Sequence, residues 1–171
     1  MTKVILANII AFIGLGLLCL ASFAKTQKKM LAADISNNIC SIIANGFLLG
    51  GTTAIVIGGF SILRSCVAMR KKPSKVVTIV IVTLSTCLSL ILNQGLVGLL
   101  PVVSNLVYST LVLCTKDTNK LKLGLSFTSV CWMLYGLCLH NYTSFGLNTL
   151  LLACNIVYFI KAKKRVNNPD Y

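Results

Sequence analysis

The sequence predicts an all-α protein that crosses a membrane as seven transmembrane helices. Of its 171 residues, 56% are hydrophobic and only 11% are charged, whereas a soluble domain carries roughly 25% charged residues. The charges also gather in short clusters, and the stretches 35–63 and 76–115 hold none. Because one membrane crossing takes about 20 apolar residues, such gaps are typical of transmembrane segments. The lipid bilayer is therefore the first expected partner of the chain.

Seven apolar segments account for these gaps. The segments that we expect to be helical are 4–24, 35–50, 52–69, 76–92, 96–114, 123–139 and 144–160. The second segment is the most polar, with Asn45 among several Asn and Ser residues. We expect it to lie inside the bundle, because polar side chains rarely face lipid. The first segment could instead be a signal peptide that ends near Ala24, but an internal repeat argues for a retained helix.

The basic residues lie on one side of this seven-helix scheme. The connections 25–34, 70–75 and 115–122 and the tail from Lys161 hold all of them except Lys3 and Arg64. By the positive-inside rule, this side is cytoplasmic and the N-terminus lies outside. We expect Arg64 to snorkel to the cytoplasmic interface; the alternative is a charge that faces the bundle interior.

The repeat becomes visible when the chain is shifted by 91 residues. Lys25 then aligns with Lys116, Lys29 with Lys120 and Cys40 with Cys131. If the later outer loop is three residues longer, Ser61–Arg64 also aligns with Asn155–Tyr158. The repeat predicts a 3+1+3 plan: a three-helix unit over 1–72, a linker helix over 73–95, a second three-helix unit over 96–165 and a cytoplasmic tail over 166–171. Two such parallel three-helix bundles are related by an axis along the membrane normal.

Composition excludes several functions. The net charge of +13 does not indicate nucleic acid, because the basic residues sit between apolar runs where topology accounts for them. The eight cysteines form no CxxC or Cys/His cluster, so we expect free thiols, no metal and no cofactor. The acids are Asp34, Asp117 and Asp170, all placed at cytoplasmic ends, and the single histidine, His140, lies in an outer loop. We therefore expect no acid–base enzyme.

Two long runs carry a resemblance to a known family. The runs "ANGFLLGGTTAIVIGGFSILRS" and "GLLPVVSNLVYSTLVLC", with "CWMLYG" and "LLLACNIVYFIK" after them, resemble the YgjV-type family of bacterial inner membrane proteins. The resemblance covers most of the chain. It implies the inner (plasma) membrane of a bacterium as the location, and it implies no particular activity.

A more distant resemblance is to the SWEET and SemiSWEET sugar transporters of the PQ-loop group. It rests on the 3+1+3 plan and on "WMLYG" from Trp132 to Gly136, followed by Asn148. In SWEETs, an aromatic or small polar residue on the second helix of each unit and an Asn on the third line the sugar site. The resemblance therefore implies that Trp132 and Asn148 bind solute. In the first unit, Ser41 is the repeat mate of Trp132, but Ala54 stands where a second Asn would be.

Other features depart from that pattern or extend it. There is no Pro-Gln dipeptide, and Pro101 is the only proline inside a predicted helix, which makes it the candidate hinge. Asn155, Ser61 and Asn45 complete the candidate solute site, because amides and hydroxyls beside an aromatic face suit a sugar-like solute. Their simpler interpretation is hydrogen bonding between helices. Four glycines also have two interpretations, close helix packing or local flexibility: Gly14, Gly16, Gly58 and Gly59.

Two functions of different class follow. The first is a facilitative transporter of a small neutral polar solute, favoured by the repeat, the polar inner helices and Trp132 with Asn148. The second is a non-transporting receptor or partner-binding subunit on the same scaffold, favoured by the missing prolines and the unmatched Asn. A pocket between the two units, lined by Trp132 and Asn155, would favour the first. The sequence leaves the oligomeric state open, a homo-oligomer included.

Overall fold

The chain folds into seven α-helices in a computed structural model, which describes residues 2–48, 52–70, 74–92, 95–138 and 142–167. The helices are α1 (Thr2–Ala21), α2 (Gln27–Ser41), α3 (Thr52–Ala68), α4 (Lys75–Ile91), α5 (Leu99–Cys114), α6 (Thr118–Cys138) and α7 (Tyr142–Asn167). A π-helical segment, Ile42–Leu48, continues α2, and a short 3-10 turn, Leu96–Gly98, precedes α5. The predicted all-helical class and the number of seven helices are confirmed.

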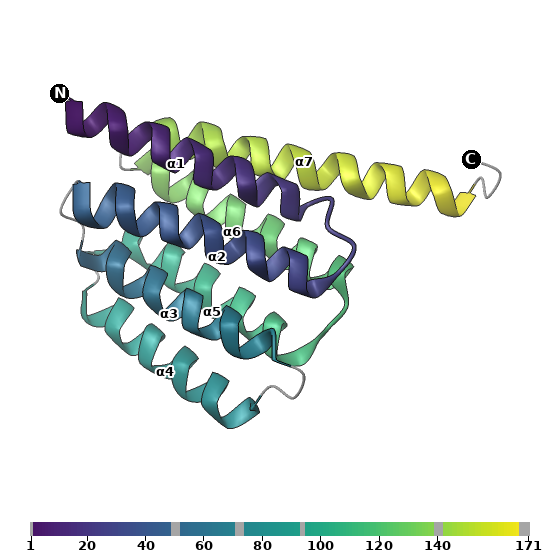
Figure 1. Cartoon of the computed structure of the whole chain (residues 1–171), viewed down its shortest axis with the longest axis horizontal. Helices are drawn as coiled ribbons and strands as arrows, with labels where there is room; N and C mark the ends of the chain where they lie inside the picture. Colours follow the sequence, from purple (N-terminus) through teal and green to yellow (C-terminus); the bar gives the residue numbers. More distant parts are fainter. Residues whose placement is uncertain (1, 49–51, 71–73, 93–94, 139–141, 168–171) are drawn as a thin grey trace.

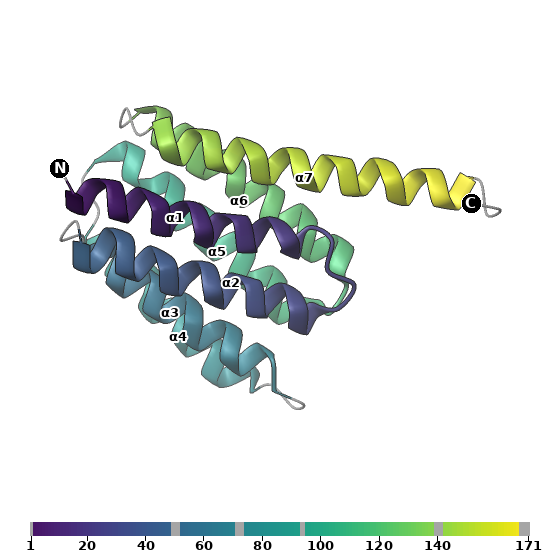
Figure 2. The same ribbon diagram turned by 45° about the horizontal axis from the view of Figure 1, so that its top comes forward.

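Helices α1, α2 and α3 form a first row, α5, α6 and α7 form a second row that faces it, and α4 lies outside both (Figures 1 and 2). Each helix packs on the next one in the chain, α7 packs on α1, and α2 touches α6 between the rows. Because α3 also touches α5 directly, α4 occupies the groove on their outer side. In the described residues the backbones of α1 and α3 do not approach one another closely, and neither do those of α5 and α7.

The outer surface of the helices is largely apolar, as expected for a protein in lipid, and many polar side chains are buried inside beside an apolar core. Phe12 on α1 and Ile91 on α4 are 61% and 76% exposed. On α4 the buried face is instead the polar one, with Thr78, Ser85 and Ser89. Within the described residues, four helical stretches are long and apolar enough to cross a membrane: Thr2–Ala21, Leu96–Cys114, Thr118–Cys138 and Tyr142–Lys164. Ile55–Ala68 and Lys75–Ile91 are shorter apolar helices. The chain is a polytopic membrane protein.

Three helix boundaries were predicted wrongly. α2 begins at Gln27 rather than 35, α6 begins at Thr118 rather than 123, and α7 continues to Asn167 rather than 160. The cause is the same each time: clusters of lysine end the apolar run but do not end the helix, because lysine is a good helix former. At the start of α2, the side chain of Thr26 caps the helix by accepting from the backbone N–H of Lys29 at 3.4 Å. Asp34 therefore lies within a helix.

Close helix contacts explain two of the four glycines noted in the sequence. A Cβ atom added to Gly14 would lie 2.5 Å from the Cβ of Cys40 on α2, and one added to Gly58 would lie 2.8 Å from Ile42. At Gly16 and Gly59 nothing lies within 4 Å. The packing interpretation is therefore confirmed for Gly14 and Gly58 and not for Gly16 and Gly59.

Candidate functional site

A cavity of about 460 Å³ lies between the two rows of helices. Residues of α1, α2, α3, α5, α6 and α7 line it, whereas none of the described residues of α4 does. It extends from Thr143, in the first turn of α7, to Asp34 on α2 and Leu125 on α6. The cavity therefore begins at the end of the bundle where α7 starts and penetrates most of its depth.

An apolar layer lies beyond the deep end of this cavity, toward the basic helix ends. It is built around Leu31 and Leu121, both completely buried, with Leu18, Met30 and Leu151 packed against them. Side chains from α1, α2, α6 and α7 meet in this layer, so it joins the two rows. The cavity thus has an apolar floor on the basic side of the bundle.

Four of the six candidate solute residues line the cavity. They are Ser41 on α2, Ser61 on α3, Trp132 on α6 and Asn148 on α7. The structure therefore brings together residues from both predicted units around one space. Asn155 is completely buried and is not among the lining residues. The side chain of Asn45 lies outside the described part of the structure.

The aromatic part of the site consists of Trp132 and Tyr135, which both line the cavity. Their rings pack edge to face, with centroids 5.5 Å apart and planes at 86°. This geometry holds the indole by a favourable ring contact. Asn148 is 8% exposed, and its Nδ2 donates to the carbonyl of Ser144 at 2.8 Å. Its amide is thus oriented by its own helix.

Pro101 is the third residue of α5 and is buried. The 3-10 turn Leu96–Gly98 leads directly into α5, so Pro101 lies near the start of one continuous helical stretch, Leu96–Cys114. The hydroxyl of Ser104 donates to the carbonyl of Pro101 at 3.0 Å. The hinge assigned to this proline stays a prediction.

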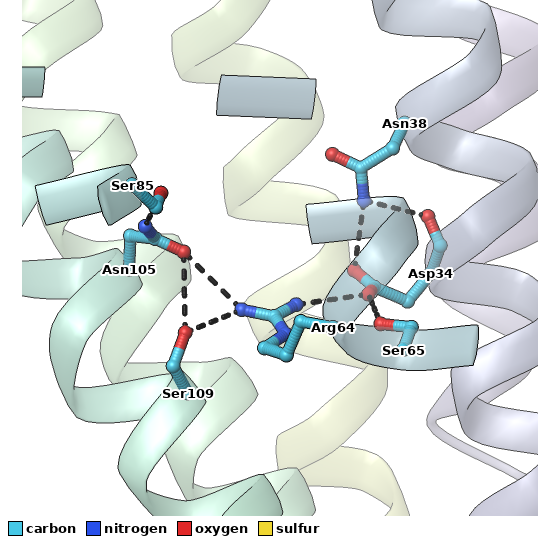
Figure 3. A network of polar contacts seen from close by, with 7 residues as sticks. All are labelled: Asp34, Asn38, Arg64, Ser65, Ser85, Asn105 and Ser109. Carbon is cyan, nitrogen blue, oxygen red and sulfur yellow. Dashed lines mark hydrogen bonds and ion pairs between the residues drawn. The ribbon is translucent and has the colours of Figure 1, made fainter. Parts of the chain in front are cut away.

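A buried ion pair forms the polar centre of the deep end (Figure 3). Nη2 of Arg64 on α3 lies 3.1 Å from Oδ2 of Asp34 on α2, and the two side chains are 3% and 10% exposed. The hydroxyl of Ser65 donates to the same carboxylate oxygen at 2.7 Å. Nδ2 of Asn38 donates to the other oxygen at 3.2 Å. Both charged residues line the cavity.

The guanidinium of Arg64 also reaches across to the second row. Nη1 donates to the hydroxyl of Ser109 at 2.7 Å and to Oδ1 of Asn105 at 3.2 Å, both on α5. Nδ2 of Asn105 donates in turn to the hydroxyl of Ser85 on α4 at 2.9 Å. Arg64 also lies over the ring of Tyr108, with its Cζ 5.1 Å from the centroid. One network of side chains therefore links α2, α3, α4 and α5 (Figure 3).

Two expectations are corrected by this network. Arg64 does not snorkel to the interface, because Asp34, Asn105 and Ser109 satisfy its charge inside the bundle. Asp34 is not at a helix end, and an acid does lie inside a helical segment. A signal for the pair was present in the sequence: an arginine in an apolar segment needs a partner, and the chain holds only three acids.

The second row holds two further buried polar residues, Lys122 and Asn155, both with 0% exposure. Nζ of Lys122 lies 3.2 Å from the centroid of the Tyr158 ring and has no hydrogen-bond partner. Neither amide atom of Asn155 has one. The hydrogen bond to a neighbouring helix that was the simpler interpretation of Asn155 is therefore not made in the described structure. Sequence reasoning misses Lys122 because the lysine-rich stretch 115–122 is typical of a loop, whereas α6 already begins at Thr118.

In the described residues, no group of three or more His, Cys, Asp or Glu side chains is arranged to hold a metal ion. All eight cysteines are free thiols, and Cys154 on α7 packs against the apolar cluster that contains Cys19 on α1. These contacts pack α7 against α1 and contribute no reactive cluster.

The fold and the site define a polytopic helical membrane protein with a polar cavity between two rows of helices. Residues 5–166 match the family Imp-YgjV, described as bacterial inner membrane protein. The chain belongs to this family, which places it in the inner membrane of a bacterium as a multi-pass protein. No curated protein and no solved structure matches the chain.

Proposed function

We propose that the chain is a facilitative transporter of a small, neutral, polar solute of the sugar type. The observation that supports this is the cavity of about 460 Å³, which is large enough for a small solute and is shared by both rows of helices. A site between two repeated units is the usual position of a transporter's solute site.

The lining of the cavity suits a polyol. Trp132 and Tyr135 offer ring faces and edges, while Asn148, Ser61 and Asn105 add hydroxyl and amide groups. Amides and hydroxyls both donate and accept, as the hydroxyls of a sugar do. A bundle that only binds a protein partner would not need such a space in its interior.

The closed floor supports a carrier rather than a pore. The layer around Leu31 and Leu121 separates the cavity from the basic side of the bundle, so solute would cross only after this layer opens. In the proposed topology the seven helices cross the membrane, the basic ends are cytoplasmic and the N-terminus is outside. The cavity then faces outward in this conformation. The 3+1+3 plan with α4 as the linker is part of the same proposal.

The experiment is uptake of radiolabelled monosaccharides by proteoliposomes that contain the whole chain. We expect saturable uptake of at least one neutral sugar, reduced at least about tenfold by Trp132→Ala, because loss of an aromatic stacking contact costs roughly 1–3 kcal/mol of binding. The matched control is Phe127→Ala on the same helix, where the ring is 43% exposed on the outer surface. Equal uptake by both variants would contradict the site, and no uptake of any sugar would contradict the function.

A further inference from the structure

The cavity holds two charged side chains in the described part of the chain, and they neutralise each other. Among its lining residues only Asp34 and Arg64 carry a formal charge. Their ion pair of 3.1 Å leaves no net charge on the lining. Lys122, which is also buried, is not among the lining residues, and its ammonium lies against the ring of Tyr158. The remaining polar lining residues near them are neutral, among them Ser61, Ser104 and Asn105.

This neutrality has a physical consequence for what can enter. A single buried charge in a space of low dielectric attracts ions of opposite sign and repels ions of like sign over many ångströms. A close pair of opposite charges produces a field that falls off much faster. An ion that enters a neutral cavity therefore loses its hydration without a compensating charge, which costs several kcal/mol, whereas a neutral polyol has only hydrogen bonds to exchange.

The geometry keeps the pair together. Nη1 of Arg64 donates to Ser109 and Asn105, which lie on α5. Nη2 donates to Asp34, which lies on α2. Ser65 donates to the carboxylate from α3. Both terminal nitrogens of the guanidinium therefore have acceptors in the protein, and only Nε, which is buried, has no hydrogen-bond partner in the described structure.

We propose that the Asp34–Arg64 pair sets the charge selectivity of the cavity, so that the site admits neutral solutes and excludes anions and cations. This assignment rests on the proposed function for its biological meaning, and it makes the two residues determinants of specificity. Removal of one charge would then turn the cavity into a site for ions of the sign of the charge removed. Removal of both would restore the neutral behaviour.

The test measures the charge selectivity of the cavity without any transported solute. A thiol is introduced by Ser61→Cys, on α3 one turn before Arg64 and about 4.5 Å along the helix axis. Two methanethiosulfonate reagents of similar size, one with a sulfonate and one with a trimethylammonium group, form a mixed disulfide there and release methanesulfinate. The ratio of the two rates, sulfonate over ammonium, is followed by mass spectrometry. The native thiol of Cys138, exposed at the end of α6, is the internal control.

The proposal predicts how the ratio of the two modification rates at position 61, sulfonate over ammonium, changes in three variants. Asp34→Asn raises the ratio by about tenfold, Arg64→Gln lowers it by about tenfold, and the double variant returns to within about threefold of the parent. The ratio at Cys138 stays constant in all four backgrounds. If the pair only held the helices together, each variant would change both rates alike, and an unchanged ratio in the single variants overturns the proposal.

A further variant covers the case in which the single variants do not fold, as judged by gel filtration. Asn105→Asp keeps an oxygen acceptor for Nη1 of Arg64 and leaves the ion pair whole, but adds one negative charge at the same place. We expect it to lower the ratio at position 61 by about tenfold, and an unchanged ratio in this folded protein also overturns the proposal. Failure of sugar uptake alone would contradict the transport function and leave these ratios unaffected, so the two hypotheses fail separately.

Discussion

The buried pair of Asp34 and Arg64 makes a quantitative prediction about stability. Asp34→Leu leaves the guanidinium of Arg64, 3% exposed, without its counter-ion. Removal of one partner of a buried ion pair typically costs about 3–5 kcal/mol, because the other charge is left uncompensated. Here Arg64 keeps its bonds to Ser109 and Asn105, so we expect the lower end of that range, about 3 kcal/mol.

The matched double variant distinguishes the pair from two independent residues. Asp34→Leu with Arg64→Met replaces both charges by apolar groups of similar size, a change that is often close to neutral for a buried pair. Ser65 then loses its acceptor and Ser109 loses a donor, at about 1 kcal/mol each, whereas Asn38 keeps its bond to the backbone carbonyl of position 34. We therefore expect the double variant to lose about 2 kcal/mol, less than Asp34→Leu alone.

The assay is reversible unfolding of the purified protein in mixed detergent micelles, followed by helical circular dichroism as the fraction of denaturing detergent rises. The free energies of the parent, the two single variants and the double variant form a thermodynamic cycle. A double variant whose loss equals the sum of the two single losses would refute the reasoning, because it would mean that the two residues do not interact in the membrane fold.

Three further predictions follow from other contacts. Gly14→Ala should destabilise the protein by about 1–3 kcal/mol through its clash with α2, whereas Gly16→Ala, with open space around it, should be neutral or stabilising by up to about 1 kcal/mol; equal effects in the same unfolding assay would contradict the α1–α2 contact. Lys122→Met should leave stability unchanged or raise it, because the ammonium is buried without a hydrogen bond, and a large loss would show that its ring contact outweighs desolvation. A thiol reagent should modify the exposed Cys138 and leave Cys19 unmodified, because Cys19 is buried in the bundle; equal labelling of the two thiols by mass spectrometry would contradict the burial of Cys19 in the apolar cluster.

Much of the fold could be predicted because lipid imposes a simple rule on composition. The charge-free runs gave seven helices in the correct order, since a helix that crosses a bilayer has to be apolar over most of its length. The same rule failed at the ends of α2, α6 and α7. There the helix leaves the apolar region and continues through lysine-rich sequence, which the apolar pattern cannot distinguish from a loop.

The candidate site was predicted in part, and the missing part has one physical cause. Trp132 and Asn148 stand out in the sequence because an aromatic or amide residue is conspicuous in an apolar helix, and both line the cavity. Asp34 was assigned to a loop because its charge seemed to exclude it from the bundle. Its partner lies 30 residues away in the chain, and a pattern read along one dimension does not show that two opposite charges cancel in space.

The most direct test of the transporter hypothesis is counterflow in proteoliposomes. Vesicles that contain the protein are loaded with a high concentration of an unlabelled neutral sugar and diluted into a trace of the same sugar in labelled form. A carrier whose cavity opens alternately to the two sides predicts a transient accumulation of label above its equilibrium level, abolished by Trp132→Ala and kept by Phe127→Ala. Label that never exceeds the level in protein-free vesicles, for every neutral sugar tested, would contradict the account.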